Sequence, residues 1–171
     1  MIVPSTTARV LVRRAAAVGV CLALLSASAA AQQPFDQHEL AAYRLTEPVF
    51  KRFAHATHLI AEASRKDARL AQTPLFTRQL TVSGDVMEGA TLLQARLEQE
   101  PTFRNALFAA ETDAKEYTMF ALALFAARLA DGFVKAGLIY VMPDGVAGGN
   151  VAFADAHRVE IGAMFSEFGV E

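Results

Sequence analysis

Two histidines and one glutamate lie close together in the stretch FAHATHLIAE, which begins at Phe53. His55, His58 and Glu62 are spaced i, i+3 and i+7, so on a helix all three would share one face. Two imidazoles and a carboxylate can bind zinc and leave a fourth position open. With all ligands on one helix, such a site would bind a divalent metal only weakly. The alternative is a polar helix face that contacts water.

The last of the four histidines in the chain, His157, is notable for its apolar surroundings. We expect one helix from Asn150, a good N-cap residue, to about Phe168. On that helix His157 falls in the middle of an apolar stripe, which consists of Phe153, Ile161, Met164, Phe165 and Phe168. A buried histidine needs a hydrogen-bond partner, and we expect a backbone carbonyl, Tyr117 or a carboxylate. The alternative is a histidine that lines a ligand pocket or acts as a general base.

A narrow polar stripe extends along the most apolar segment of the chain. It consists of Tyr117, Arg128, Asp131 and Lys135. Asp131 has helix-pair spacing with both Arg128 and Lys135. We interpret this stripe as an exposed seam. The alternative is a buried polar or ligand site that His157, Tyr117, Arg128 and Asp131 form together.

The elements that position these residues are all predicted to be helices, because Ala and Leu are frequent and strand-like alternation is rare. Thr46 is a plausible N-cap for a helix that runs to about Lys66 and carries the histidine pair. Thr73-Pro74 suggests a short helical turn. A second long helix is expected to start at Ser83 or Asp85, and its expected apolar stripe is Val86, Ala90, Leu93 and Leu97.

Pro101 is expected to separate two helices in the middle of the chain. Glu100-Pro101 should end the second long helix, since the residue before proline is disfavoured in helical geometry. Pro101 can open a short helix that buries Phe103, Ala106, Leu107 and Ala110.

The segment 112–136 is predicted to be the central helix, with Thr112 as its cap. It carries a run that is apolar all round, from Met119 to Ala127, which is too short to span a bilayer. We therefore predict an all-α fold, a single domain of about five helices packed in an orthogonal or antiparallel array around 112–136.

The first residues have the organisation of a signal peptide. Arg9, Arg13 and Arg14 precede an apolar run, and small residues follow it at 28–31. We expect cleavage after about Ala31. The predicted organisation is a signal peptide at 1–31, a loose N-terminal segment at 32–44 and a helical domain at 45–171. The protein should then be exported, either to a periplasm or fully secreted.

Charge and cysteine content exclude several classes of function. Without the leader, 13 basic and 18 acidic residues remain, so the net charge is −5. This argues against a nucleic-acid surface and against binding to anionic lipid. We also expect no membrane span in the mature chain. The single cysteine, Cys21, lies within the predicted leader, so the mature chain has neither a disulfide nor a cysteine nucleophile.

Motifs of established catalytic chemistry are missing from the sequence. There is no HExxH, no GxSxG, no phosphate-binding GxxxxGK and no CxxCH. The first hypothesis is therefore a non-enzymatic binding module with an unknown protein partner or an apolar small-molecule partner, and with no resident cofactor. The second is a metal-binding protein that uses His55, His58 and Glu62. The third is an enzyme with His157 as general base.

Three short features together resemble small secreted all-helical bacterial proteins of no established function. They are Tyr43-Arg44-Leu45-Thr46 before an amphipathic helix, the break centred on Pro101, and the start Asn150-Val151-Ala152-Phe153 followed by His157. The resemblance implies an exported helical domain and transfers no catalytic or binding residue to this chain.

Overall fold

The computed structural model describes residues 37–71, 75, 86–138 and 146–166, all within one compact unit, Pro34–Glu171. The described residues form helices joined by turns and contain no strand, which confirms the all-α prediction. The helices are α2 (Gln37–Ala42), α3 (Glu47–Lys66), α4 (Ala68–Ala71), α6 (Val86–Gln99), α7 (Pro101–Ala109), α8 (Ala114–Lys135), α9 (Gly148–Ala156) and α10 (Arg158–Ser166).

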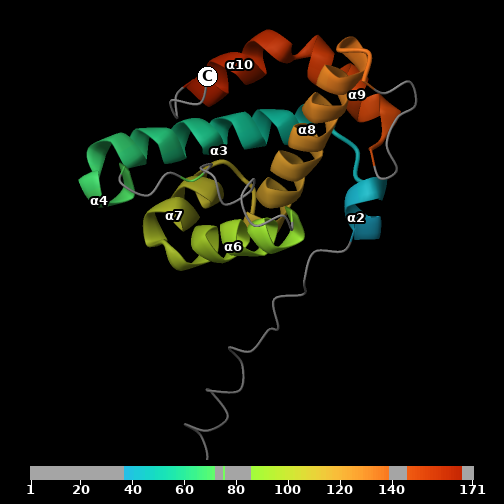
Figure 1. Ribbon diagram of the computed structural model, residues 1–171. Coiled ribbons are helices and arrows are strands. Elements are labelled where there is room, and N and C mark those ends of the chain that lie inside the picture. The colour runs from blue at the N-terminus through green and yellow to red at the C-terminus, as the bar shows by residue number, and fades with distance from the viewer. Residues whose placement is uncertain (1–36, 72–74, 76–85, 139–145, 167–171) are drawn as a thin grey trace, which may run out of the picture. The chain divides into compact units, whose positions relative to one another are not determined.

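Helix α8 is the centre of the fold, as predicted. It contacts α2, α3, α6, α7 and α9, and it crosses α3 steeply in Figure 1. Every residue from Tyr117 to Leu124 is buried. The N-cap is Asp113 rather than the expected Thr112, and its carboxylate accepts a hydrogen bond from the Glu116 backbone N–H at 2.8 Å. Asp113 is the better cap because its negative carboxylate also interacts favourably with the positive N-terminal end of the helix dipole.

Helix α3 has the bounds that the sequence predicts, with Thr46 at the N-cap position. The Thr46 side chain makes no capping hydrogen bond. Phe53 anchors the helix on α8, where its ring lies 4.6 Å from the Tyr117 ring and 4.7 Å from the Phe120 ring, measured between centroids. Such aromatic pairs stabilise a core beyond the area that they bury.

Helices α6 and α7 meet at Pro101, as predicted. The backbone of Glu100 is extended, and its carboxylate accepts a hydrogen bond from the Thr102 N–H, which makes Glu100 the N-cap of α7. Of the expected apolar faces, the described side chains are buried, namely Ala90, Leu93 and Leu97 on α6 and Phe103, Ala106, Leu107 and Ala110 at α7. The Val86 side chain lies outside the described residues. The predicted helix start at Ser83 or Asp85 and the predicted turn at Thr73-Pro74 lie outside the described residues.

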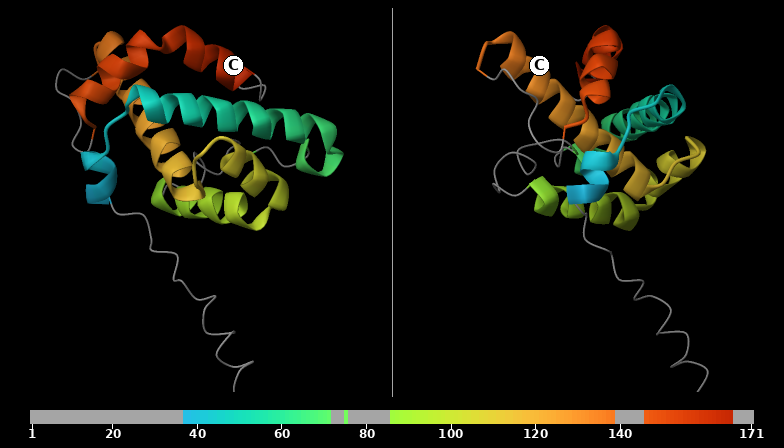
Figure 2. Two further views of the ribbon diagram at one scale, coloured as in Figure 1. Left: turned by 180° about the vertical axis from the view of Figure 1, so that it is seen from behind. Right: turned by 90° about the vertical axis from the view of Figure 1, so that its right-hand side faces the viewer.

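The prediction of a single helix from Asn150 to about Phe168 is wrong. The segment divides into α9 and α10, with His157 as the C-cap of α9. Helix α9 packs on α8, whereas α10 packs on α3, and Figure 2 shows α10 following α3. Because α3 and α8 cross, one straight helix could not follow both. Phe168 lies outside the described residues.

Two further differences from the prediction concern the start of α9 and the segment before α3. Helix α9 begins at Gly148, so Asn150 sits inside its first turn instead of capping it. Residues 37–42, expected to be part of a loose segment, form α2, which packs on α8. The Asn150 side chain accepts a hydrogen bond from the Leu45 N–H and donates one to the Tyr43 carbonyl, and these two bonds fix the chain that follows α2.

Candidate functional site

The His157 side chain lies where α9 and α10 meet the start of α3. Its Nε2 atom is 3.1 Å from Glu47 on α3, and its Nδ1 atom is 3.1 Å from Glu160 on α10. The ring also packs on two aromatic neighbours in tilted arrangements, with its centroid 4.8 Å from that of Phe50 and 4.4 Å from that of Phe153. The sequence correctly predicted a carboxylate partner. The expected position inside an unbroken apolar stripe is wrong, because the helix turns at this residue.

The chemistry of this arrangement favours a structural role for His157. Its two ring nitrogens point in opposite directions, and each meets a carboxylate. Only the doubly protonated imidazolium can donate a hydrogen bond to both. The ring therefore links three helices, and the described contacts occupy both nitrogens. The hypothesis that His157 is a general base stays a prediction.

The second expected partner of His157, Tyr117, lies elsewhere. The Tyr117 hydroxyl is 2.9 Å from Oγ1 of Thr57 on α3, and both side chains are buried. Burial raises the pKa of Tyr117 strongly, and the hydrogen bond with Thr57 opposes that shift only in part. Tyr117 is thus not part of an exposed seam. The polar stripe of α8 faces solvent only in the second half of the helix. In the first half, α3 covers the stripe at Tyr117.

Two of the remaining residues of the stripe, Asp131 and Lys135, belong to an ion network on the surface. Lys135 contacts Asp131 at 2.7 Å and Asp155 of α9 at 2.8 Å. The predicted Asp131–Lys135 spacing is therefore used, and it links α8 to α9. Arg128 is exposed. The described contacts do not bring His157, Tyr117, Arg128 and Asp131 together as one site.

The metal-ligand candidates lie on the outward face of α3. His55 and His58 are exposed, and Glu62 forms an ion pair with Lys66 at 2.6 Å. The hydrogen bond from Lys66 lowers the pKa of Glu62. Within the described part of the chain, no group of three or more His, Cys, Asp or Glu side chains is arranged to hold a metal ion. The proposed His55, His58 and Glu62 site stays a prediction.

A surface that the sequence analysis missed follows the second half of α8. Phe125, Leu129 and Phe133 are 44%, 47% and 40% exposed. Their i, i+4 and i+8 spacing places them on one face, which we call the α8 strip. Val134 and Leu138, further along the chain, are also exposed. The four-residue spacing of Phe125, Leu129 and Phe133 was the available signal, but we expected only the polar stripe of this helix to be exposed.

Helix α8 is also the single helix among the described residues that is long and apolar enough to cross a membrane, by length and composition alone. More than half of its most apolar window is buried against other helices. This is how the core helix of a folded domain behaves. We therefore treat α8 as the core helix and the α8 strip as its uncovered part.

Comparison with known proteins adds no assignment, since no family model, curated protein or solved structure matches the chain.

Proposed function

We propose that this chain is an exported, non-enzymatic interaction module that binds a partner protein through the α8 strip. The observation that carries the proposal is the exposure of Phe125, Leu129 and Phe133 on one face of the central helix. Large apolar side chains that gather on a surface are typical of interaction sites, whereas single exposed ones are ordinary. The exposed Phe108 of α7 is an example of the second kind.

The energetics favour a partner that covers the strip. Full burial of one such side chain contributes roughly 1.5–3 kcal/mol, and each strip residue is a little less than half exposed. A partner that buried the remaining surface would therefore gain about 1 kcal/mol from each of the three side chains. Aromatic residues at the centre of a contact are also the residue type that dominates binding energy at interfaces.

The charge of the chain favours a protein over a membrane or a nucleic acid. Residues 32–171 carry 13 basic and 18 acidic residues, and this net negative charge repels phosphate-rich surfaces. Export is supported by the signal-peptide pattern at 1–31, with basic residues, an apolar run and small residues in the required order.

The proposal is tested with two matched variants recovered from an exporting host. Leu129→Glu combined with Phe133→Glu places two charges on the strip, and Phe108→Glu places one on an exposed phenylalanine outside it. Native mass spectrometry of each purified protein reports the mass of any protein bound to it. We expect a complex for the original sequence and for Phe108→Glu, and its loss in the double variant.

Two results would count against the proposal. One is a complex that survives in the double variant, which would move the interface elsewhere. The other is the absence of any complex from all three proteins. Circular dichroism of each protein ensures that a lost complex reflects a changed surface and not unfolding.

A further inference from the structure

The contact between α10 and α3 combines a small apolar part with one polar link. The buried residues of α10 are Ile161 and Met164, and the helix packs on α9 and α3. The polar link is the His157 ring at the start of α10, with Nε2 3.1 Å from Glu47 of α3 and Nδ1 3.1 Å from Glu160 of α10. A short helix with few buried side chains opens locally at a lower free-energy cost than a core helix. The state of the ring therefore matters for the attachment of α10.

Both contacts of the ring require its doubly protonated form. A neutral imidazole has one N–H, so its other nitrogen presents a lone pair to a carboxylate 3.1 Å away. If Nδ1 keeps the proton, the hydrogen bond to Glu47 is lost. If Nε2 keeps it, that hydrogen bond loses one of its two charges and is weaker. Loss of a proton thus weakens the link to α3 in either tautomer.

The ring and its carboxylate partners are accessible to water. The side chain of His157 is 20% exposed, and those of Glu47 and Glu160 are 49% and 65% exposed. Solvent can therefore exchange a proton with the ring. A carboxylate that is no longer bound to the ring can turn to water at little cost, because it is already partly hydrated.

Other charged side chains on the helices around this junction do not titrate in the same range. They are Glu47 and Lys51 of α3, Lys135 of α8, Asp155 of α9, and Arg158 and Glu160 of α10. Lys51 contacts Glu47 at 3.6 Å, and Lys135 contacts Asp155 at 2.8 Å. Carboxyl groups ordinarily ionise below about pH 5 and lysine and arginine above about pH 10, whereas histidine changes charge between about pH 5 and 8.

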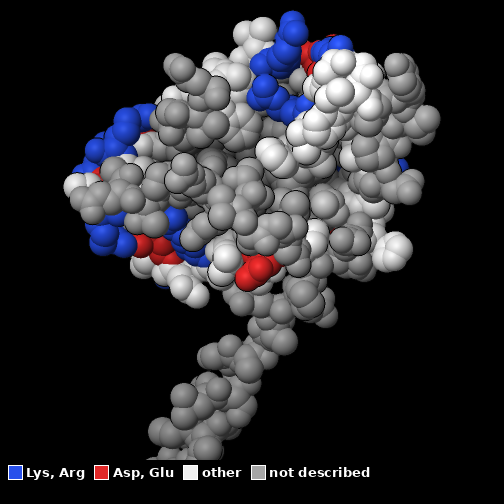
Figure 3. Space-filling model, viewed as in Figure 1, with Lys and Arg blue, Asp and Glu red and all other residues white. Residues whose placement is uncertain are grey.

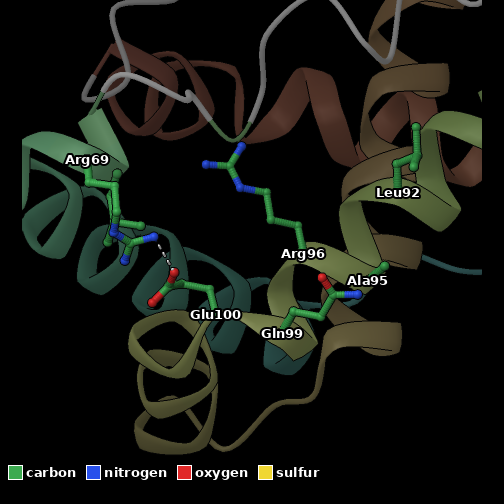
Figure 4. Close-up of a pocket in the computed structure, with 7 residues that line it drawn as sticks. Arg69, Leu92, Ala95, Arg96, Gln99 and Glu100 are labelled. Carbon is green, nitrogen blue, oxygen red and sulfur yellow. Dashed lines mark hydrogen bonds and ion pairs between the residues drawn. The ribbon is translucent and has the colours of Figure 1, made fainter.

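A contact between other helices of the fold provides the contrast. Arg69 of α4 donates from Nη1 to Glu100, the N-cap of α7, at 2.9 Å, as Figure 4 shows. Figure 3 shows basic and acidic side chains gathered over α4 and the adjoining end of α3. A guanidinium stays charged in proteins, so this ion pair does not depend on pH in the range in which histidine titrates. Helix α7, which has nine residues as α10 has, is therefore a suitable internal reference.

We infer that His157 makes the packing of α10 on α3 sensitive to pH. The doubly protonated ring holds α10 on α3, and its conversion to the neutral ring loosens α10 and gives water access to Ile161 and Met164. The device depends on the charge of one side chain between two carboxylates from different helices. This inference is independent of the proposed α8 interface.

Hydrogen–deuterium exchange of the protein recovered from an exporting host tests the inference between about pH 5.5 and 8.5. Amide protection, corrected for the intrinsic exchange rate at each pH, should fall about fivefold in α10, because a hydrogen bond between two charged groups is stronger than one with a single charge. Protection of α7 should not change. An NMR titration of the His157 ring should show that it loses its proton at the same pH at which α10 loses protection.

Three variants separate the ring from other causes. His157→Gln cannot titrate, so its α10 protection should be independent of pH. Glu47→Gln removes the charge but keeps an acceptor, so the change in α10 protection should be smaller than in the original protein. His55→Gln, which removes an exposed histidine of α3, is the matched control and should keep the full change.

Circular dichroism of each variant identifies any that fails to fold. The inference is overturned if α10 protection in the original protein is the same across the pH range, or if it changes at a pH different from that of the ring titration. A folded His157→Gln protein with the same pH dependence as His55→Gln would overturn it as well.

Discussion

The contact between Tyr117 and Thr57 is a pair of hydroxyl groups inside the core. Neither side chain has appreciable exposure, and among the described residues no buried side-chain nitrogen or oxygen lacks a hydrogen-bond partner. The pair joins α3 to α8 where the aromatic core is densest. Removing one hydroxyl leaves the other buried with less hydrogen bonding than it has now, whereas removing both spares that penalty.

The corresponding prediction concerns the free energy of unfolding. Tyr117→Phe and Thr57→Val should each destabilise the protein by about 1–3 kcal/mol. The double variant should lose less than the sum of the two, because the coupled groups disappear together. Urea unfolding of the four proteins measures this difference. Strictly additive losses would contradict a coupled pair.

Tyr43 gives a prediction about alkaline pH. Burial, followed by the charge of Glu116, raises the pKa of Tyr43 to about 12. An unfolded tyrosine ionises near pH 10, so between about pH 10 and 12 the unfolded state binds fewer protons than the folded state. The stability that Tyr43 contributes is therefore complete below pH 10 and is lost as the pH rises towards 12.

The measurement compares the original protein with Tyr43→Phe. Tyrosinate absorbance should show one fewer group ionising near pH 12 in the variant. The loss of stability from pH 10 to 12 should be smaller in the variant by about 1–2 kcal/mol, a value reduced because Tyr43 is only half-buried. A group in the difference titration that ionises near pH 10 would contradict the account.

From the sequence we could predict which type of group pairs with a buried polar side chain, but not which residue supplies it. The sequence called for a partner at His157 and named carboxylates among the choices, and Glu47 and Glu160 are the partners found. It could not select Glu47, because that contact depends on how α3 and α9 pack. Tyr117 and Thr57 were beyond reach for the same reason, since their contact joins residues 60 positions apart.

At the scale of elements, Asn150 joins α9 to the segment that follows α2. Its Oδ1 accepts from the Leu45 N–H at 2.9 Å, and its Nδ2 donates to the Tyr43 carbonyl at 3.0 Å. Asn150 is buried, so water cannot replace these bonds without a local rearrangement. The amide is suited to this position because it supplies one acceptor and one donor at once.

Asn150→Ala should therefore lower the free energy of unfolding by about 2–3 kcal/mol, because it leaves a backbone N–H and a carbonyl without their partner. Asn105→Ala, on the exposed face of α7, is the matched control and should change it by less than about 0.5 kcal/mol. Urea denaturation measures both. Equal stability of the two variants would show that the Asn150 bonds do not hold α9 in place.

Local signals predicted the bounds of α3 and the junction between α6 and α7. Pro101 separates α6 from α7, and Thr46 precedes α3, because caps and prolines act within one or two turns. The division between α9 and α10 was missed because its cause is tertiary. The apolar stripe of Phe153, Ile161 and Met164 continues on both sides of His157, so it predicts one helix. The turn at His157 arises where the two halves follow different helices.

At the scale of the whole unit Pro34–Glu171, the sequence predicted the all-α class and the central place of α8. Composition and the apolar run from Met119 were sufficient for both, since a helix that is apolar all round must be covered by others. The extent of that cover could not be predicted. Helices α6 and α9 pack on α8, yet Phe125, Leu129 and Phe133 remain exposed.

Photo-crosslinking in an exporting host can show directly whether a partner protein binds at the α8 strip. A benzoylphenylalanine replaces Phe133 in one protein and Phe108, the exposed phenylalanine outside the strip, in the other. We expect one discrete crosslinked protein band for position 133 and none for position 108. Equal crosslinking at both positions, or none at position 133, would contradict it.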